Sequence, residues 1–250
     1  MTDDWSPVAV EWDRWWGSLA APLWKLAGLA AGSRVLDVGC GSGRFLAAAI
    51  GRGASAAGAD SSPAMVELAR RAAPDADVRV ARAEALPWPA STFDVVTAIN
   101  ALQFADDPDA AAAEMVRVAV PGGSVIVANW SERARNELDV INTALAGEPL
   151  EDGDLRLPGG LEDLLADAGV RDINAGLVDV PWEVPDDEAL IAGILLGEEG
   201  PVPTILDAAR PFRTATGGYR FLNHFRWASG TKRARPVNTP AGPSRRRATS

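Results

Sequence analysis

The sequence is poor in the residues that build disulfides and metal sites. Its 250 residues include one cysteine, Cys40, and one histidine, His224. A lone cysteine excludes an internal disulfide and a thiolate metal cluster, and a lone histidine excludes a multi-histidine metal site. We therefore expect no bound metal, and a reducing, cytoplasmic compartment.

Long apolar runs are absent as well. The longest stretch without a charged residue runs from Val118 to Ser131, and Pro121, Gly122 and Gly123 interrupt it. A membrane-spanning helix needs about 20 predominantly apolar residues. The chain also opens with Met-Thr-Asp-Asp-Trp, which is acidic where a secretory signal would be basic. These features predict no signal peptide and no membrane partner.

Charge is unevenly distributed along the chain. The formal net charge is −10, yet residues 230–250 hold six basic residues and no acidic one, which leaves 34 acidic and 18 basic residues elsewhere. An acidic body repels nucleic acid, so we expect no nucleic-acid partner. The last 21 residues are rich in Pro, Arg, Ser and Thr, which predicts a disordered basic tail over residues 230–250. Nothing in the pattern fixes the oligomeric state.

Strand-like and helix-like segments alternate from about residue 33 onward. The predicted strands are 33–39, 54–60, 77–82, 93–99, 124–130, 172–180 and 219–228. The predicted helices are 43–50, 63–73, 106–116, 132–145, 161–168, 186–197 and 202–212. This alternation is typical of an α/β domain with a parallel, doubly wound sheet that is covered by helices on both faces.

A glycine-rich turn after the first predicted strand is the most informative segment. It reads Val-Leu-Asp-Val-Gly-Cys-Gly-Ser-Gly over residues 35–43, and such glycines let backbone N–H groups approach a ligand. A phosphate-binding P-loop needs lysine after its last glycine, where this chain has Arg44. A dinucleotide-binding loop needs its third glycine at the position that Arg44 occupies. A third class of loop has an acidic residue two positions before the first glycine, as Asp37 stands here.

With Asp37, the glycine-rich turn and Asp60 at the end of the next strand, the chain resembles the class I S-adenosylmethionine-dependent methyltransferases. It looks most like their small-molecule branch, related to ubiquinone and menaquinone biosynthesis methyltransferases. The resemblance covers residues 10–130 well and continues more weakly to residue 228. It implies a Rossmann-like seven-stranded sheet, mostly parallel with the last strand antiparallel. It also implies S-adenosyl-L-methionine as cofactor and a small, apolar or aromatic methyl acceptor.

The resemblance also implies which residues hold the cofactor. Asp60 would accept hydrogen bonds from the ribose hydroxyls, Ala83 would meet the adenine ring, and Asn100 would border the methionine part. Asn100 and Gln103 could instead be ordinary helix-entry residues. The complete set of predicted cofactor-binding residues is Trp16, Asp37, Gly39, Cys40, Gly41, Asp60, Ser61, Met65, Ala83, Glu84, Asn100 and Gln103.

The segment Arg-Ala-Glu-Ala-Leu-Pro-Trp departs from the family pattern. Arg82 stands where the family usually has an acidic residue that meets the adenine amino group. The resemblance leaves two interpretations of Glu84, which is either a substitute for that acid or an ordinary surface carboxylate.

Two further segments are predicted to close over the site. Five of the nine tryptophans fall in the first 24 residues, and Trp12, Trp15 and Trp16 share one helical face. We predict an N-terminal helical cap over residues 1–30, which either packs on the core or closes over cofactor and substrate. Helices with apolar stripes at 186–212 predict a lid inserted in a methyltransferase domain that spans residues 31–229.

Other functions remain open at this point. A Cys40–His224 nucleophile is rejected, because Cys40 stands where the turn needs a small residue and His224 shares a strand face with two arginines. No catalytic base stands out. The alternatives are a nicotinamide-dependent dehydrogenase and a protein that binds the methyltransferase cofactor without transferring methyl groups. The sequence does not identify the acceptor or the atom that is methylated.

Overall fold

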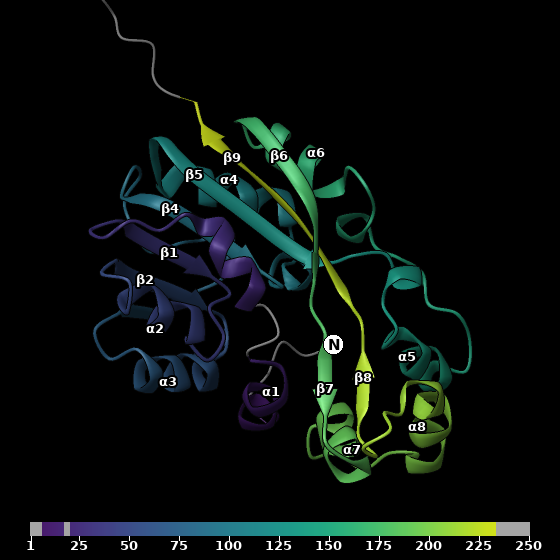
Figure 1. Cartoon of the computed structure of the whole chain (residues 1–250). Helices are drawn as coiled ribbons and strands as arrows, with labels where there is room; N and C mark the ends of the chain where they lie inside the picture. The colour runs from purple at the N-terminus through teal and green to yellow at the C-terminus, as the bar shows by residue number, and fades with distance from the viewer. Residues whose placement is uncertain (1–6, 18–20, 234–250) are drawn as a thin grey trace, which may run out of the picture.

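The computed structural model describes residues 7–17 and 21–233, and a seven-stranded sheet lies at its centre (Figure 1). The strand order is β3-β2-β1-β4-β5-β9-β6. The strands are β1 (Arg34–Val38), β2 (Ser55–Asp60), β3 (Asp77–Val80), β4 (Phe93–Ile99), β5 (Ala119–Trp130), β6 (Val170–Asp179) and β9 (His224–Lys232). The first five strands in this order, from β3 through β2, β1 and β4 to β5, pair in parallel. Strand β9 pairs antiparallel with both β5 and β6. The predicted fold class, with its antiparallel last strand, is confirmed.

Helices cover both faces of this sheet, as its apolar strands require. One layer comprises η1 (Ala21–Ala27), α2 (Arg44–Ile50) and α3 (Pro63–Ala72), and the other comprises α4 (Pro108–Val118) and α6 (Gly160–Asp167). Each layer has its own core. Phe45 and Val66 bury against Val95 on the first face, and Met115 and Leu165 bury against the second.

Helices α3 and α4 begin at side-chain caps. Ser62 Oγ accepts a hydrogen bond from Met65 N at 3.3 Å, with proline next at the first helical position. Asp107 Oδ1 caps α4 by accepting from Ala110 N at 2.9 Å. These oxygens satisfy backbone N–H groups that lack partners within the helix, which fixes where each helix starts. The start of α4 therefore lies at Pro108 and not at residue 106 as predicted.

A second, smaller unit lies beside the carboxyl ends of the strands (Figure 1). It contains β7 (Trp182–Val184), α7 (Asp187–Leu195), α8 (Val202–Ala209), η5 (Arg210–Phe212) and β8 (Tyr219–Phe221). Strands β7 and β8 pair with each other and continue the directions of β6 and β9 away from the main sheet. We call residues 182–221 the lid segment, and it is longer than the insertion predicted at 186–212.

The lid segment has its own hydrophobic core, to which α5 (Asp139–Ala146) contributes. Leu190 and Ile205 of the lid helices bury against Phe221 of β8 and Ile141 of α5. Much of the apolar stripe on the lid helices is therefore buried inside this unit. The predicted helix 132–145 is broken, because η3 (Arg133–Arg135) precedes α5 as a separate turn, and η4 (Asp154–Arg156) follows it.

Two predicted strand boundaries are wrong. The predicted strand 219–228 is interrupted between β8 and β9, where the buried Asn223 side chain accepts a hydrogen bond from Leu138 N at 3.1 Å. β5 begins at Ala119 and not at residue 124 as predicted, and its register with β4 shifts between Phe93 and Val95. Both departures depend on contacts with distant segments, which local patterning does not contain.

The ends of the chain are described in part. Of the predicted N-terminal cap, α1 (Ala9–Trp16) and η1 are described, whereas residues 1–6 and 18–20 lie outside the described residues. The predicted start of the tail at residue 230 is wrong, because residues 230–232 belong to β9. Lys232 Nζ also donates to Ala119 O at 2.7 Å. Residues 234–250 lie outside the described part.

Within residues 7–17 and 21–233, no helix has both the length and the apolar character needed to span a membrane.

The corrected boundary gives the first testable prediction. A chain that ends at Ser229 loses the pairing of Gly230, Thr231 and Lys232 with β5 and β6, whereas a chain that ends at Arg233 keeps it. We expect the chain ending at Ser229 to melt about 5 °C lower, a loss of about 2 kcal/mol. Thermal unfolding followed by circular dichroism measures this, with the full chain as control. Equal melting temperatures for the two truncated chains would contradict the boundary.

Candidate functional site

The turn between β1 and α2 is the first element of the site. Gly39 has φ +70° and Gly43 has φ +81°, a backbone conformation that favours glycine. A Cβ on Gly39 would lie 2.3 Å from the Ala101 side chain, so this turn also needs glycine for close packing. The N–H groups of Gly39 and Cys40 both donate to Ala59 O, at 2.8 and 2.9 Å. The turn is thereby fixed against the end of β2.

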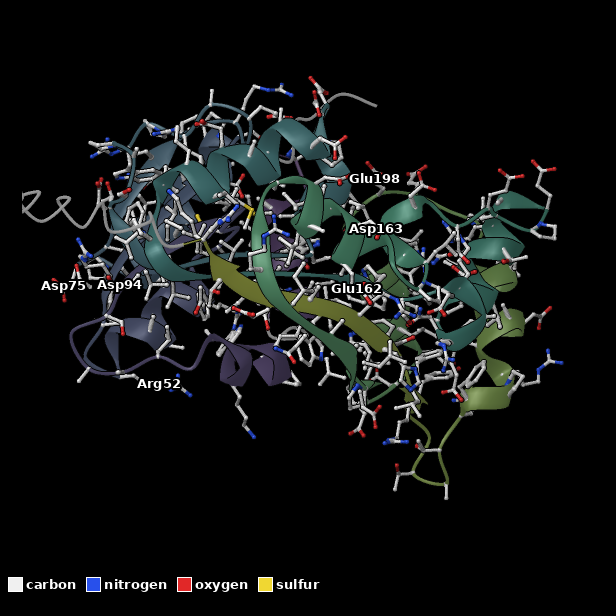
Figure 2. The ribbon with its side chains drawn as sticks, turned by 90° about the horizontal axis from the view of Figure 1, so that it is seen from above. Arg52, Asp75, Asp94, Glu162, Asp163 and Glu198 are labelled. Carbon is white, nitrogen blue, oxygen red and sulfur yellow. The ribbon has the colours of Figure 1, made fainter. Side chains whose placement is uncertain are left out.

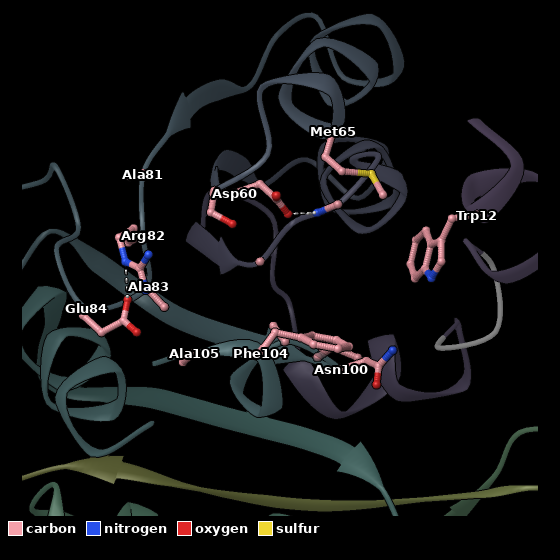
Figure 3. A pocket seen from close by; sticks show the side chains of 15 residues that line it. Trp12, Asp60, Met65, Ala81, Arg82, Ala83, Glu84, Asn100, Phe104 and Ala105 are labelled. Atoms are coloured by element: carbon pink, nitrogen blue, oxygen red, sulfur yellow. Dashed lines mark hydrogen bonds and ion pairs between the residues drawn. The ribbon is translucent and has the colours of Figure 1, made fainter. Parts of the chain in front are cut away.

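Asp60, the last residue of β2, lies next to this turn and faces a cavity (Figure 3). Its Oδ2 accepts from Gly41 N and its Oδ1 accepts from Ser62 N, both at 2.9 Å. Burial raises the pKa of Asp60, while the two backbone N–H donors act in the opposite direction. Each carboxylate oxygen retains a further lone pair, so the group can accept two more hydrogen bonds from a ligand.

This cavity, which we call the nucleoside cavity, gathers most of the predicted site residues. Eight of the twelve line it: Gly39, Gly41, Asp60, Ser61, Met65, Ala83, Glu84 and Asn100. Met65 comes from the start of α3, and the others come from the ends of β1, β2 and β4 and from the segment after β3, so the carboxyl edge of the parallel strands brings them together. Their contact with a cofactor stays a prediction.

Sequence reasoning did not assign every residue of this wall. Trp12, Ala81, Arg82, Ile99, Ala101, Phe104 and Ala105 also line the nucleoside cavity. The sequence pattern places Trp12 in the tryptophan cluster of the predicted cap, and it marks Arg82 as a departure from the family pattern. Phe104 carries a usable signal, since it is a large apolar residue just after a strand end, and its exposed fraction is 49%.

The other four predicted residues lie elsewhere. Asp37 is buried behind the turn, where its Oδ1 accepts from Thr97 Oγ1 at 2.6 Å. Cys40 packs toward β2, where a Cβ on Gly58 would lie 2.9 Å from its Sγ. Trp16 faces a neighbouring cavity, and Gln103 donates to Asn100. None of these four belongs to the nucleoside cavity as the described residues define it.

Two buried ionisable groups near the turn, Asp37 and Cys40, have raised pKa values. Burial raises the pKa of Asp37 to about 7, and the nearby charge of Asp60 adds to this, whereas the Thr97 hydrogen bond opposes it. Burial also raises the pKa of the Cys40 thiol well above its ordinary value. A thiol that resists ionisation is a poor nucleophile, which agrees with the rejection of a Cys40–His224 pair.

Arg82 and Glu84 are tied to each other and to the approach to α4. Arg82 Nη2 lies 2.5 Å from Asp106 Oδ2, and its Nε lies 3.5 Å from Glu84 Oε2. Glu84 Oε1 accepts from Asp106 N at 2.8 Å. The Glu84 carboxylate therefore organises the wall of the nucleoside cavity beside Ala83 (Figure 3).

A second cavity, which we call the acceptor cavity, adjoins the first. The two share Trp12, Ile99, Asn100 and Phe104 as a common wall. The remaining lining residues are Trp16, Gly17, Trp130, Leu138, Asn142, Leu145, Gly193, Ile194, Leu196 and Phe225. None of the described residues that line this second cavity has an ionisable side chain. It is therefore an aromatic and aliphatic space with a few amide groups.

Helix α1 connects the glycine-rich turn to the lid segment. Asp13 Oδ1 accepts from Ser42 Oγ at 2.5 Å and from Arg44 Nε at 2.6 Å. Trp16 Nε1 donates to Gly193 O at 2.8 Å, and its ring stacks on Trp182 at 4.5 Å between centroids. Trp16 thus packs on the lid core and also lines the acceptor cavity, while Trp12 lines both cavities. Closure of this helix over cofactor and substrate stays a prediction.

Comparison with known proteins identifies the central domain. Residues 36–127 match the family model described as a methyltransferase domain. A demethylmenaquinone methyltransferase from Renibacterium salmoninarum is 38% identical over 104 residues, which cover 42% of this chain and 44% of that protein. A ubiquinone biosynthesis O-methyltransferase from Alkalilimnicola ehrlichii is 35% identical over 115 residues, 44% of this chain and 47% of that protein.

Solved structures agree on the fold. The YcgJ protein from Bacillus subtilis superimposes with a TM-score of 0.62 at 20% identity, covering 88% of this chain and all of that one. The chain spans less than half the length of the two curated relatives. Residues 36–127 match a methyltransferase domain, and this segment holds the glycine-rich turn, Asp60 and Asn100, in agreement with the resemblance.

The buried Asp37 predicts how stability depends on pH. Its pKa lies above the unfolded value, so the folded protein holds a proton that the unfolded chain releases, and stability falls as pH rises from about 4 to about 7. Asp37→Asn removes this loss while keeping an acceptor for Thr97. We expect the stability of Asp37→Asn relative to the parent to increase by on the order of 2 kcal/mol between pH 5 and pH 8.

Urea unfolding at the two pH values measures this difference. Asp94→Asn is the control, because an ion pair with Arg34 lowers the pKa of Asp94, so this variant should gain no stability as pH rises. A stability difference for Asp37→Asn that does not change between pH 5 and pH 8 would show that Asp37 is not protonated in this range.

Proposed function

We propose that this chain is an S-adenosylmethionine-dependent methyltransferase that acts on a small, apolar or aromatic metabolite. The observation that carries the proposal is the pair of adjoining cavities with one common wall. A methyl donor on one side of Trp12 and Asn100 and an acceptor on the other side would meet at this wall. Holding two reactants in line is a large part of what an enzyme contributes to such a transfer.

The nucleoside cavity suits the cofactor chemically. The Asp60 carboxylate has lone pairs for the two ribose hydroxyls, and Met65 and Ala83 offer apolar surface to an adenine ring. Gly39 and Gly41 leave room beside the turn because they carry no side chain. When bound, the cofactor supplies an activated methyl group on a positively charged sulfur. Asp60 and Glu84 in the cavity wall would attract a ligand of that charge when ionised, whereas Arg82 in the same wall would repel it.

The acceptor cavity supports the finer statement about substrate. Its described lining offers aromatic rings and aliphatic side chains and no carboxylate or imidazole that could remove a proton. An acceptor of low pKa, or one that carries its own base, therefore suits this cavity best. The two curated relatives are named for methyltransferases of quinone biosynthesis, which supports an aromatic acceptor.

A nicotinamide-dependent dehydrogenase finds less support. Arg44 occupies the position of the third glycine of a dinucleotide loop, and its guanidinium is hydrogen-bonded to Asp13 of α1. A protein that binds the cofactor without transferring methyl groups is the alternative outcome of the turnover test below. The cytoplasmic location remains a prediction from the single cysteine.

Binding and turnover together test the proposal. Calorimetry should detect binding of S-adenosylmethionine and no binding of NAD. Asp60→Asn should weaken the binding of S-adenosylmethionine about 10- to 100-fold, because charged hydrogen bonds are lost. Asp94→Asn is a matched control, since Asp94 lies on the side of the molecule away from the lid helices (Figure 2). Methyl-labelled cofactor offered with phenolic, polyketide and quinol acceptors measures turnover. Binding of NAD alone would reject the proposal, and cofactor binding without transfer to any acceptor would favour the non-transferring alternative.

The lid segment allows a sharper test of the acceptor cavity. Ile194 lines this cavity, whereas Ile191, on the same helix α7 and also half-buried, does not. We expect Ile194→Ala to raise the KM of the acceptor several-fold with little change in the KM of the cofactor. Ile191→Ala should leave both constants near the parent values. Equal effects of the two substitutions on acceptor KM would mean that α7 acts only through stability.

A further inference from the structure

The single glutamine of the chain stands behind the wall that the two cavities share. Gln103 lies on η2 (Leu102–Phe104), and its Nε2 donates to Asn100 Oδ1 at 2.7 Å. Gln103 lines neither the nucleoside cavity nor the acceptor cavity, whereas Asn100 lines both. Gln103 lines a third cavity, together with Asn129 and Trp130. Its hydrogen bond to Asn100 links it directly to the wall that the first two cavities share.

The backbone of Asn100 is already fixed by other contacts. Its φ of +56° is in the left-handed region, which asparagine adopts more readily than most residues. Its N–H donates to Ala128 O at 2.8 Å, which holds the end of β4 against β5. These backbone contacts do not orient the side-chain amide of Asn100. The hydrogen bond from Gln103 orients it. With Oδ1 engaged, the amide nitrogen points toward the side of the cavity where Trp12 lies (Figure 3).

Gln103 is a poor choice for stability alone. Its Oε1 is buried and has no hydrogen-bond partner among the described residues. A buried acceptor without a partner is destabilising, and an apolar side chain of similar length would avoid that cost. The amide is therefore useful for what it does to Asn100 and not for packing.

We propose that Gln103 is a positioning residue, which turns the Asn100 amide N–H groups toward the junction of the two cavities to bind an oxygen atom of the methyl acceptor. The inference rests on the proposed function and adds the acceptor's chemistry. An aromatic ring would occupy the apolar walls, and a hydroxyl or carbonyl oxygen on it would meet Asn100. The junction is the place where such an oxygen would face the methyl donor.

The test compares two probes that differ by one hydroxyl group. Equilibrium dialysis gives the dissociation constants of 1-naphthol and naphthalene for the full chain, with and without S-adenosylhomocysteine. Gln103→Met keeps the length and removes the amide. We expect Gln103→Met to weaken the binding of 1-naphthol about three- to tenfold relative to the binding of naphthalene, which is the range for one hydrogen bond. Gln103→Glu, which can only accept from Asn100, should produce the same loss.

Two further readouts separate positioning from a structural role. In an Asn100→Ala background, Gln103→Met should have no additional effect on the ratio of the two constants. The melting temperature of Gln103→Met should equal or exceed that of the parent, because the buried acceptor without a partner is removed.

An unchanged ratio of the 1-naphthol and naphthalene dissociation constants in Gln103→Met would overturn the proposal, as would a parent protein that does not bind 1-naphthol. So would a lower melting temperature of Gln103→Met together with equally weakened binding of both probes. Weaker binding of S-adenosylhomocysteine with 1-naphthol unaffected would place the effect of Gln103 on the cofactor and would overturn it too. Failure of the parent to bind S-adenosylmethionine would instead reject the proposed function. The ratio of the 1-naphthol and naphthalene dissociation constants, measured without S-adenosylhomocysteine, would still test the role of the Gln103 amide.

Discussion

The site depends on how closely the turn between β1 and α2 approaches the end of β2. Ala59 O accepts two N–H groups of the turn, and the Asp60 carboxylate accepts a third from Gly41. This approach requires a small residue on β2, because a Cβ on Gly58 would lie 2.7 Å from Leu46 Cδ1 and 2.9 Å from Cys40 Sγ. The turn is thus organised by the protein itself before any ligand arrives, and a pre-organised site loses less conformational freedom on binding.

The same approach places two carboxyl groups where burial disfavours their ionisation. The pKa values of Asp37 and Asp60 are both raised, mainly by burial, and the charge of Asp60 raises that of Asp37 further. Arg82, the guanidinium that lines the nucleoside cavity, lies within ion-pair distance of Asp106 and Glu84. A cationic ligand in the cavity would favour ionisation of both aspartates.

Much of this arrangement could be predicted from the sequence, because its signals are local. The glycines of the turn, Asp60 at a strand end and the cap at Ser62 each follow from short-range patterns, and the parallel sheet brings their positions together. The residues that were misplaced or not assigned depend on distant contacts. Trp12 lies in the cavity wall on α1, which Asp13 holds to the distant Ser42, and Trp16 packs on the distant Trp182. The lid is longer than predicted because β6 and β9 continue into it as β7 and β8.

The central claim is that the cavity beside Asp60 holds the nucleoside of a methyl donor and opens onto the acceptor cavity. A crystal structure of the protein with S-adenosylhomocysteine tests it most directly. The account predicts both ribose hydroxyls within hydrogen-bond distance of the Asp60 carboxylate, and the sulfur at the wall formed by Trp12, Asn100 and Phe104. A nucleoside bound elsewhere, or a sulfur that faces away from the acceptor cavity, would contradict it.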